Sequence, residues 1–139
     1  EINLGCPNVN SYSIDEKSLQ RFADKFPMTM VKVSPTVDIN FIRWLQGCGI
    51  KTVHLSNTIP TDKGGISGAQ LREINVPLYN HISGWFKNSG MGFIAGGGIY
   101  RPEHVRQYKA AGASSFSIST VCFTPWRIPS IINEVYERK

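Results

Sequence analysis

The 139-residue sequence has no long hydrophobic run, and only 18% of its residues are charged. Its longest apolar stretches, such as residues 53–55 and 92–99, are far shorter than the roughly 20 residues that a membrane-spanning helix needs. We therefore predict no membrane span. Because 41% of the residues are hydrophobic and glycine and proline show no periodic arrangement, the collagen-like, low-complexity and disordered classes are excluded as well. The length allows one domain, residues 1–139, around one core.

Cysteine and histidine are both scarce, with three residues of each. Cys6, Cys48 and Cys122 lie far apart and form no CxxC pair, so neither a disulfide framework nor a zinc site is expected. This cysteine usage fits a reducing compartment, and we expect a cytoplasmic protein. The histidines belong to one predicted strand and two predicted helices, so a protease-like cysteine and histidine pair is not indicated.

Clustered positive charge is also missing, although the formal net charge is +5. The basic residues are dispersed along the chain, so nucleic acid is not indicated as a partner, and a mildly basic surface or a small anionic ligand explains the charge. The sequence contains neither a GxxxxGK loop nor a GxGxxG fingerprint, which excludes a P-loop nucleotide site and a Rossmann dinucleotide site.

What the sequence does contain is a strict alternation of short apolar runs and amphipathic segments. Ser13 and Glu16 have the spacing of a capping box, Asp38 can cap a second helix, and Pro77 is expected to kink or break a third. Five consecutive strand and helix units indicate a parallel sheet, because each right-handed crossover needs a helix to return the chain. The predicted strands are residues 1–5, 29–33, 52–55, 93–94 and 115–118, and the predicted helices are residues 16–26, 38–47, 69–87, 102–111 and 125–137.

Each predicted strand ends in a polar or glycine-rich loop. An open sheet concentrates its ligand site at one switch point, whereas a (β/α)8 barrel collects side chains from the carboxyl ends of many strands. We therefore predict the C-terminal five βα units of a TIM barrel. A complete barrel takes about 250 residues, and the sequence begins without Met inside a predicted strand. We expect the N-terminal strands to lie upstream in the same polypeptide or in a second chain, and the protein to form a homo-oligomer.

Two loops at the last two predicted strands are suited to bind phosphate. Gly96, Gly97 and Gly98 follow one strand, and Ser119 and Thr120 follow the next. Glycine allows close approach of backbone N–H groups to an anion, and barrels commonly bind phosphate at this place.

Several other polar residues are predicted to share this end of the sheet. Lys32 lies in an apolar strand, where its charge is costly unless it reaches the carboxyl-end site. Asn3, Asn8 and Asn57 offer both donors and acceptors, which suits the planar edge of a heterocyclic substrate. Cys6 is the candidate acid or base, since a thiol pKa of about 8.5 can be adjusted for proton transfer at carbon.

Six motifs, taken in order, resemble the second part of dihydroorotate dehydrogenases, and the resemblance covers essentially the whole chain. It implies an FMN-containing (β/α)8 barrel that oxidises dihydroorotate to orotate in de novo pyrimidine (UMP) biosynthesis. The motifs are EINLGCPN at residues 1–8, VKVSP at 31–35, SNT at 56–58, GGISG at 64–68, IAGGGI at 94–99 and ST at 119–120.

The resemblance also implies a role for each matching residue. Cys6 would be the base that removes the C5 proton of dihydroorotate while hydride passes from C6 to flavin N5, and a cysteine here resembles the soluble class 1 enzymes rather than the membrane-associated class. The residues implied for the pyrimidine are Asn3, Asn8, Asn57 and Thr58. Those implied for FMN are Asn3, Lys32, Ser56, Ser67 and Gly68, with Gly97, Gly98, Ser119 and Thr120 at its phosphate.

The motifs depart from this family at two positions. Gly5 replaces a serine that is common in class 1, and the resulting Gly-Cys-Pro is similar to dihydrouridine synthases, FMN barrels that reduce uridines in tRNA. However, VKVSP is not followed by the arginine that is typical of dihydrouridine synthases. Residues 56–58 also stand where that family usually has a histidine and arginine pair. Ser119 stands where many class 1 members have glycine. A third alternative is a half-barrel that serves as a structural or ligand-binding subunit and catalyses no reaction.

Overall fold

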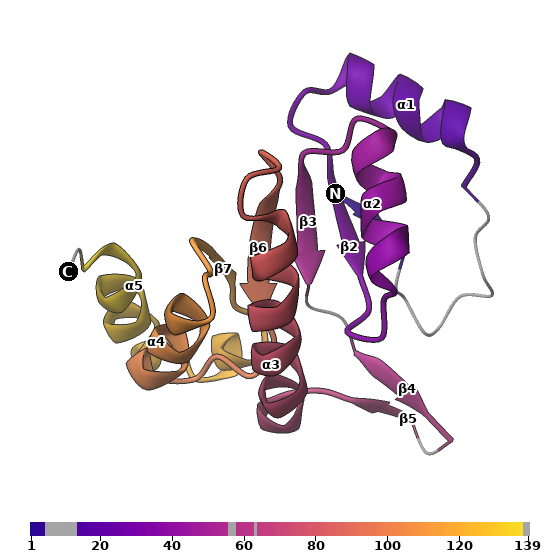
Figure 1. Ribbon diagram of the computed structural model, residues 1–139. Coiled ribbons are helices and arrows are strands. Elements are labelled where there is room, and N and C mark those ends of the chain that lie inside the picture. Colours follow the sequence, from indigo (N-terminus) through magenta and orange to yellow (C-terminus); the bar gives the residue numbers. More distant parts are fainter. Residues whose placement is uncertain (5–13, 56–57, 63, 138–139) are drawn as a thin grey trace.

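The computed structural model describes residues 1–4, 14–55, 58–62 and 64–137 (Figure 1). Strands and helices alternate along the chain as predicted, and among the described helices none is both long and apolar enough to cross a bilayer. The elements are β1 (Ile2–Asn3), α1 (Glu16–Lys25), β2 (Met30–Val33), α2 (Ile39–Gly47), β3 (Thr52–Leu55), β4 (Ile59–Thr61), β5 (Gly64–Ile66), α3 (Ala69–Phe86), β6 (Gly92–Gly96), α4 (Pro102–Ala110), β7 (Ser115–Ser117), the 3-10 turns η1 (Thr120–Phe123) and η2 (Pro125–Arg127), and α5 (Ile128–Tyr136).

Five strands form one parallel sheet in the order β1-β2-β3-β6-β7. An α-helix is the next element after β1, β2 and β6, and α5 follows β7 after the turns η1 and η2. Between β3 and α3 the chain forms an antiparallel hairpin, β4 and β5, which was not predicted and which projects away from the sheet in Figure 1. The carboxyl ends of the five strands therefore lie along one edge of the sheet.

One face of the sheet carries the core. Val31 pairs in register with Val53, and Val53 with Phe93, and all three are buried. Alternate residues of a strand point to opposite faces, so this row faces the helices. It packs in one cluster with Leu19, Ile42, Leu45, Tyr79, Ile82, Phe86, Val105, Tyr108 and Ile131 from the five α-helices.

The opposite face carries a row of mixed polarity. Asn3, Lys32, His54, Ile94 and Ser115 are in register across all five strands. His54 is nevertheless buried, and its Nδ1 lies 2.6 Å from a carboxylate oxygen of Glu1. A closed barrel would enclose this row, and the row leads directly to the carboxyl ends of the strands.

The helix boundaries follow local capping, with two corrections to the predictions. Asp38 caps α2 as predicted and accepts the Asn40 amide at 2.9 Å. The N-cap of α1 is Asp15 and not Ser13, which lies outside the described residues; Asp15 accepts the Ser18 amide at 2.9 Å, and its negative charge suits a helix N-terminus. Of the kink or break predicted at Pro77, the break is wrong: α3 runs continuously from Ala69 to Phe86 with Pro77 inside it, since proline removes one donor and already has a helical φ.

Candidate active site

A cavity of about 130 Å³ opens at the carboxyl ends of β2, β6 and β7. Nine of the predicted site residues are described by the structure, and eight of these line the cavity. The ninth, Asn3, lies beside Lys32 in the register of β1 and β2. Cys6, Asn8, Ser56 and Asn57 were also predicted and lie outside the described residues. The cavity is lined by Lys32, Thr58, Ser67, Gly68, Leu71, Gly97, Gly98, Ile99, Ser117, Ser119 and Thr120.

The wall at the end of β6 is a turn of residues 96–98, called here the glycine turn. Gly97 and Gly98 have φ values of 91° and 68°, a backbone region that residues with a side chain rarely adopt. A Cβ atom at Gly98 would lie 2.5 Å from the carbonyl oxygen of Gly68, and one at Gly97 would lie 2.8 Å from Leu71. Only glycine therefore lets this backbone lie against the start of α3 and line the cavity directly.

The N-terminus of α3 forms a second wall. Gly68 is its N-cap residue, with a φ of 68°, and no side chain of the described residues caps this helix end. Gly68 and Leu71 both line the cavity. The first amides of a helix and its dipole favour an anion placed at this end, so α3 adds to the glycine turn as an anion-binding element.

The charge of the lining also favours an anion. Lys32 supplies one cation, and Ser67, Ser119 and Thr120 supply hydroxyl groups that can donate hydrogen bonds. Among the described lining residues there is no carboxylate. The donors fit a phosphate monoester, because its oxygens accept hydrogen bonds from amides, hydroxyls and ammonium groups alike. A cavity of this size accounts for the phosphate end of a flavin mononucleotide and not for its ring system.

Behind the glycine turn lie four polar side chains that the sequence analysis missed: Arg72 and Asn75 from α3, and His104 and Tyr108 from α4. Burial, followed by the nearby Arg72, lowers the pKa of His104 below its usual 6.5. Burial raises the pKa of Tyr108. The sequence signal for Asn75 is its place in the buried stripe of α3, where the other buried residues are Leu71, Tyr79, Ile82 and Phe86.

Curated relatives of the chain are catalytic subunits of dihydroorotate dehydrogenase B (NAD(+)). The protein from Shouchella clausii is 26% identical, and the match covers 97% of this chain and 52% of that protein. The protein from Halalkalibacterium halodurans is 23% identical, with 99% and 53% covered. The chain thus spans about half the length of the curated relatives it matches. No protein-family model matches it.

Solved structures of dihydroorotate dehydrogenases also match the chain. The crystal structure of a dihydroorotate dehydrogenase from Eimeria tenella in complex with ferulenol superimposes with a TM-score of 0.72 at 18% identity, covering 96% of this chain and 48% of that one. The predicted fold, five βα units of a (β/α)8 barrel, is confirmed by this match. The resemblance to dihydroorotate dehydrogenases that the six motifs indicated is likewise confirmed.

Proposed function

We propose that this chain supplies five βα units of an FMN-dependent barrel that oxidises dihydroorotate to orotate in pyrimidine biosynthesis, in the cytoplasm. One observation carries the proposal: eight residues chosen from separate motifs line one cavity at the carboxyl ends of the strands. That edge is where (β/α)8 barrels hold their active sites. The names of the curated relatives support the same reaction and make NAD⁺ the first electron acceptor to test.

The cofactor would bind with its phosphate at the glycine turn and the β7 end. Gly97, Gly98, Ser119 and Thr120 would hold the phosphate, and Ser56, Ser67 and Gly68 would contact the cofactor beside it. Lys32 would face the ring system, where a fixed ammonium group stabilises negative charge. When bound, the flavin supplies the acceptor for the hydride of the substrate.

The substrate would lie between the cofactor and the loop that follows β1. Asn3, Asn8, Asn57 and Thr58 would bind the pyrimidine through paired donors and acceptors. Cys6 would act as the base and take the proton from C5. Loss of that proton together with the hydride at C6 leaves the C5–C6 double bond of orotate.

The reaction requires more of the barrel than this chain holds. The relatives are about twice as long, and the five-stranded sheet ends at β1 and β7. We propose that the remaining βα units come from the same polypeptide or from a second chain, and that the completed enzyme is a homo-oligomer.

Flavin binding and flavin reduction test the proposal. Protein with a completed barrel should purify with bound flavin, and dihydroorotate added without oxygen should bleach the flavin absorbance. Lack of flavin after reconstitution would exclude the enzyme. Salt-dependent binding of tRNA, with flavin that dihydroorotate does not bleach, would instead support a dihydrouridine synthase.

Replacing Cys6→Ser tests the assigned base. Serine is a far poorer base at neutral pH, and general base catalysis typically contributes about 100-fold or more, so bleaching by dihydroorotate should slow by at least that factor while FMN affinity stays unchanged. Stopped-flow absorbance measures the rate. Cys122→Ser, at an exposed free cysteine, is the control and should bleach at the normal rate. An unchanged rate in Cys6→Ser would show that another group takes the proton.

A further inference from the structure

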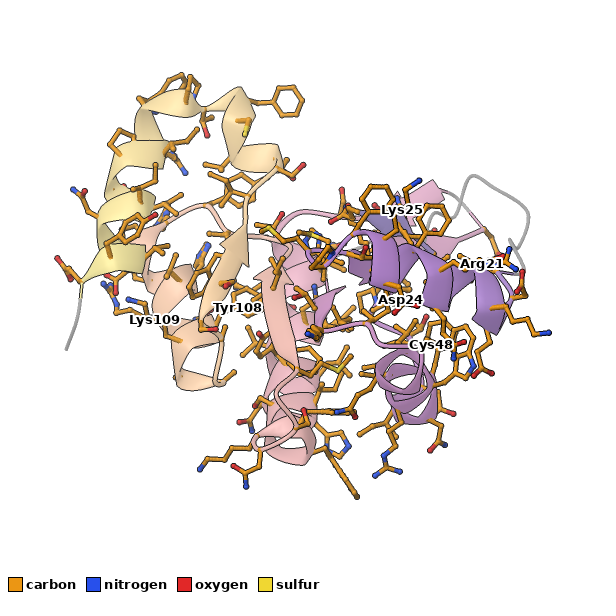
Figure 2. All side chains as sticks on the ribbon, turned by 90° about the horizontal axis from the view of Figure 1, so that it is seen from above. Arg21, Asp24, Lys25, Cys48, Tyr108 and Lys109 are labelled. Carbon is orange, nitrogen blue, oxygen red and sulfur yellow. The ribbon has the colours of Figure 1, made fainter. Side chains whose placement is uncertain are left out.

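Side chains from the helical layer bind the first two carbonyl groups of the glycine turn. The Gly96 carbonyl oxygen accepts a hydrogen bond from Asn75 Nδ2 at 2.8 Å and from the Tyr108 hydroxyl at 2.8 Å. The same hydroxyl lies 2.9 Å from the Gly97 carbonyl oxygen. Figure 2 shows Tyr108 between α4 and the strands. These two carbonyls are therefore held on the helix side of the sheet, away from the cavity.

An arginine and a histidine hold the third carbonyl. Arg72 Nη1 lies 3.4 Å from the Gly98 carbonyl oxygen and 2.7 Å from Nε2 of His104. The Tyr100 amide donates to Nδ1 of His104 at 3.0 Å, which assigns the proton of the neutral ring to Nε2, so Nε2 is a second donor beside the guanidinium and not its acceptor. The Gly98 backbone also raises the pKa of His104, as donation from the ring to the Gly98 carbonyl would. The guanidinium and the imidazole thus share one carbonyl acceptor.

The direction of these carbonyls fixes the direction of the next amides. In a planar trans peptide the C=O group and the following N–H group point in opposite directions, and the described part of the chain has no cis peptide bond. Carbonyls 96, 97 and 98 point to the helices, so the N–H groups of Gly97, Gly98 and Ile99 point to the other side. These three residues line the cavity, whereas Arg72, Asn75 and Tyr108 are absent from its described lining.

Asn75 shows that this arrangement has an energetic cost. Its Oδ1 atom is buried and has no hydrogen-bond partner within the described part of the chain. An unsatisfied buried acceptor is unfavourable, and an apolar side chain at this place in the α3 stripe would avoid it. Nδ2 of the same side chain offsets this cost, because it donates the hydrogen bond that holds the Gly96 carbonyl.

We propose that Arg72, Asn75, Tyr108 and His104 form a carbonyl clamp, a set of positioning residues that turns three consecutive N–H groups into the cavity as a phosphate-binding nest. The four residues act through the backbone and do not contact the phosphate. The identity of the ligand as FMN rests on the proposed function, whereas the clamp itself requires only a phosphate group.

The phosphate contribution is isolated by comparing FMN with riboflavin, which lacks the phosphate. Both ligands are titrated by fluorescence into protein with a completed barrel, and the ratio of their affinities is the readout. Tyr108→Phe removes one hydroxyl from the clamp and should lower the preference for FMN about tenfold while riboflavin affinity stays unchanged. Arg72→Lys keeps the charge, loses the planar fork and should act in the same direction if Tyr108→Phe does not fold.

Tyr79→Phe is the matched control. Tyr79 is also a buried tyrosine that donates to a backbone carbonyl, that of Phe93 at 2.7 Å, and burial raises its pKa as well. Removal of the Tyr79 hydroxyl should lower the free energy of unfolding and leave the preference for FMN over riboflavin unchanged. An unchanged preference in the Tyr108→Phe and Arg72→Lys proteins, or an equal loss in Tyr79→Phe, would overturn the clamp.

Inorganic phosphate separates the clamp from the flavin. If the protein binds neither flavin, the proposed function fails, but titration with phosphate should still shift the amide NMR signals of Gly97 and Gly98. The shifts should persist at the same phosphate concentrations in Tyr79→Phe and need about tenfold more phosphate in Tyr108→Phe. Absence of any shift in the unmodified protein would overturn the clamp as well.

Discussion

At Gly98, the start of α3 already occupies the space for a side chain. A Cβ atom there would lie 2.5 Å from the Gly68 carbonyl oxygen and 2.8 Å from Cβ of Arg72, and the φ of 68° is unfavourable for alanine. Gly98→Ala should therefore lower the free energy of unfolding by about 2 kcal/mol or more and weaken phosphate binding. Urea denaturation measures the first effect and FMN titration the second.

Gly84→Ala is the matched control, because Gly84 lies within α3 and a Cβ there would meet no atom within 4 Å. Alanine at an exposed helical site stabilises a helix by about 0.5–1 kcal/mol relative to glycine. The two substitutions should thus change stability in opposite directions. A Gly98→Ala protein as stable as the unmodified one would show that the glycine turn can shift without cost.

His104 makes the clamp sensitive to pH. Burial first, and then the Arg72 guanidinium on α3, lower its pKa, with Arg101 at the N-cap of α4 acting in the same direction. The Gly98 backbone and Glu103 of α4 raise it, and the net direction is down from 6.5. The unfolded chain therefore binds a proton more readily than the folded one. The stabilising contribution is complete above about pH 6.5 and is lost as the pH falls towards the folded-state pKa.

The expected result is a melting temperature that falls more steeply between about pH 7 and pH 5 in the unmodified protein than in His104→Gln. Differential scanning calorimetry across this range measures it. His81→Gln, at an exposed histidine of α3, should leave the slope unchanged. Equal slopes in the His104→Gln and unmodified proteins would mean that His104 titrates alike in both states.

At the scale of elements, local patterns were sufficient for most of the fold. β3 was predicted at its observed bounds, because residues 52–55 combine β-branched and apolar side chains between Gly49 and Ser56-Asn57, and Asp38 marked the start of α2. The hairpin of β4 and β5 was missed. Its strands have three residues each and contain Pro60 and two glycines, so they are too short and too interrupted to show apolar alternation, although Ile59, Thr61 and Ile66 are β-branched.

Some residues of the candidate site could likewise be predicted from the sequence, and others could not. Lys32, Ser67 and Gly98 were predicted because parallel topology brings the carboxyl ends of the strands to one edge, so a strand-end position was enough to place them. Arg72 and Tyr108 could not be found in that way. Their partners are backbone carbonyls of another element, which every sequence contains, and only the packing of α3 and α4 against the glycine turn brings them together.

At the scale of the whole molecule, the sheet has two ends. β1 and β7 each pair with one neighbour, and Asn3 and Ser115 are exposed on the face that a closed barrel would enclose. Phe123 and Trp126, beyond β7, are 85% and 73% exposed. Unpaired strand edges and apolar patches favour association with other chains.

The chain without the proposed remaining units should therefore self-associate and bind flavin poorly, whereas the completed barrel should be monodisperse and flavin-loaded. Sedimentation velocity at two concentrations, with flavin absorbance, measures both properties. The double substitution Phe123→Ser and Trp126→Ser removes the two exposed aromatic side chains and leaves both sheet edges, so association should persist in it. If it becomes monomeric, these side chains and not the open sheet cause association. A flavin-loaded monomer of these 139 residues alone would contradict the open-barrel proposal, because the cofactor would then need no strand beyond β1 and β7.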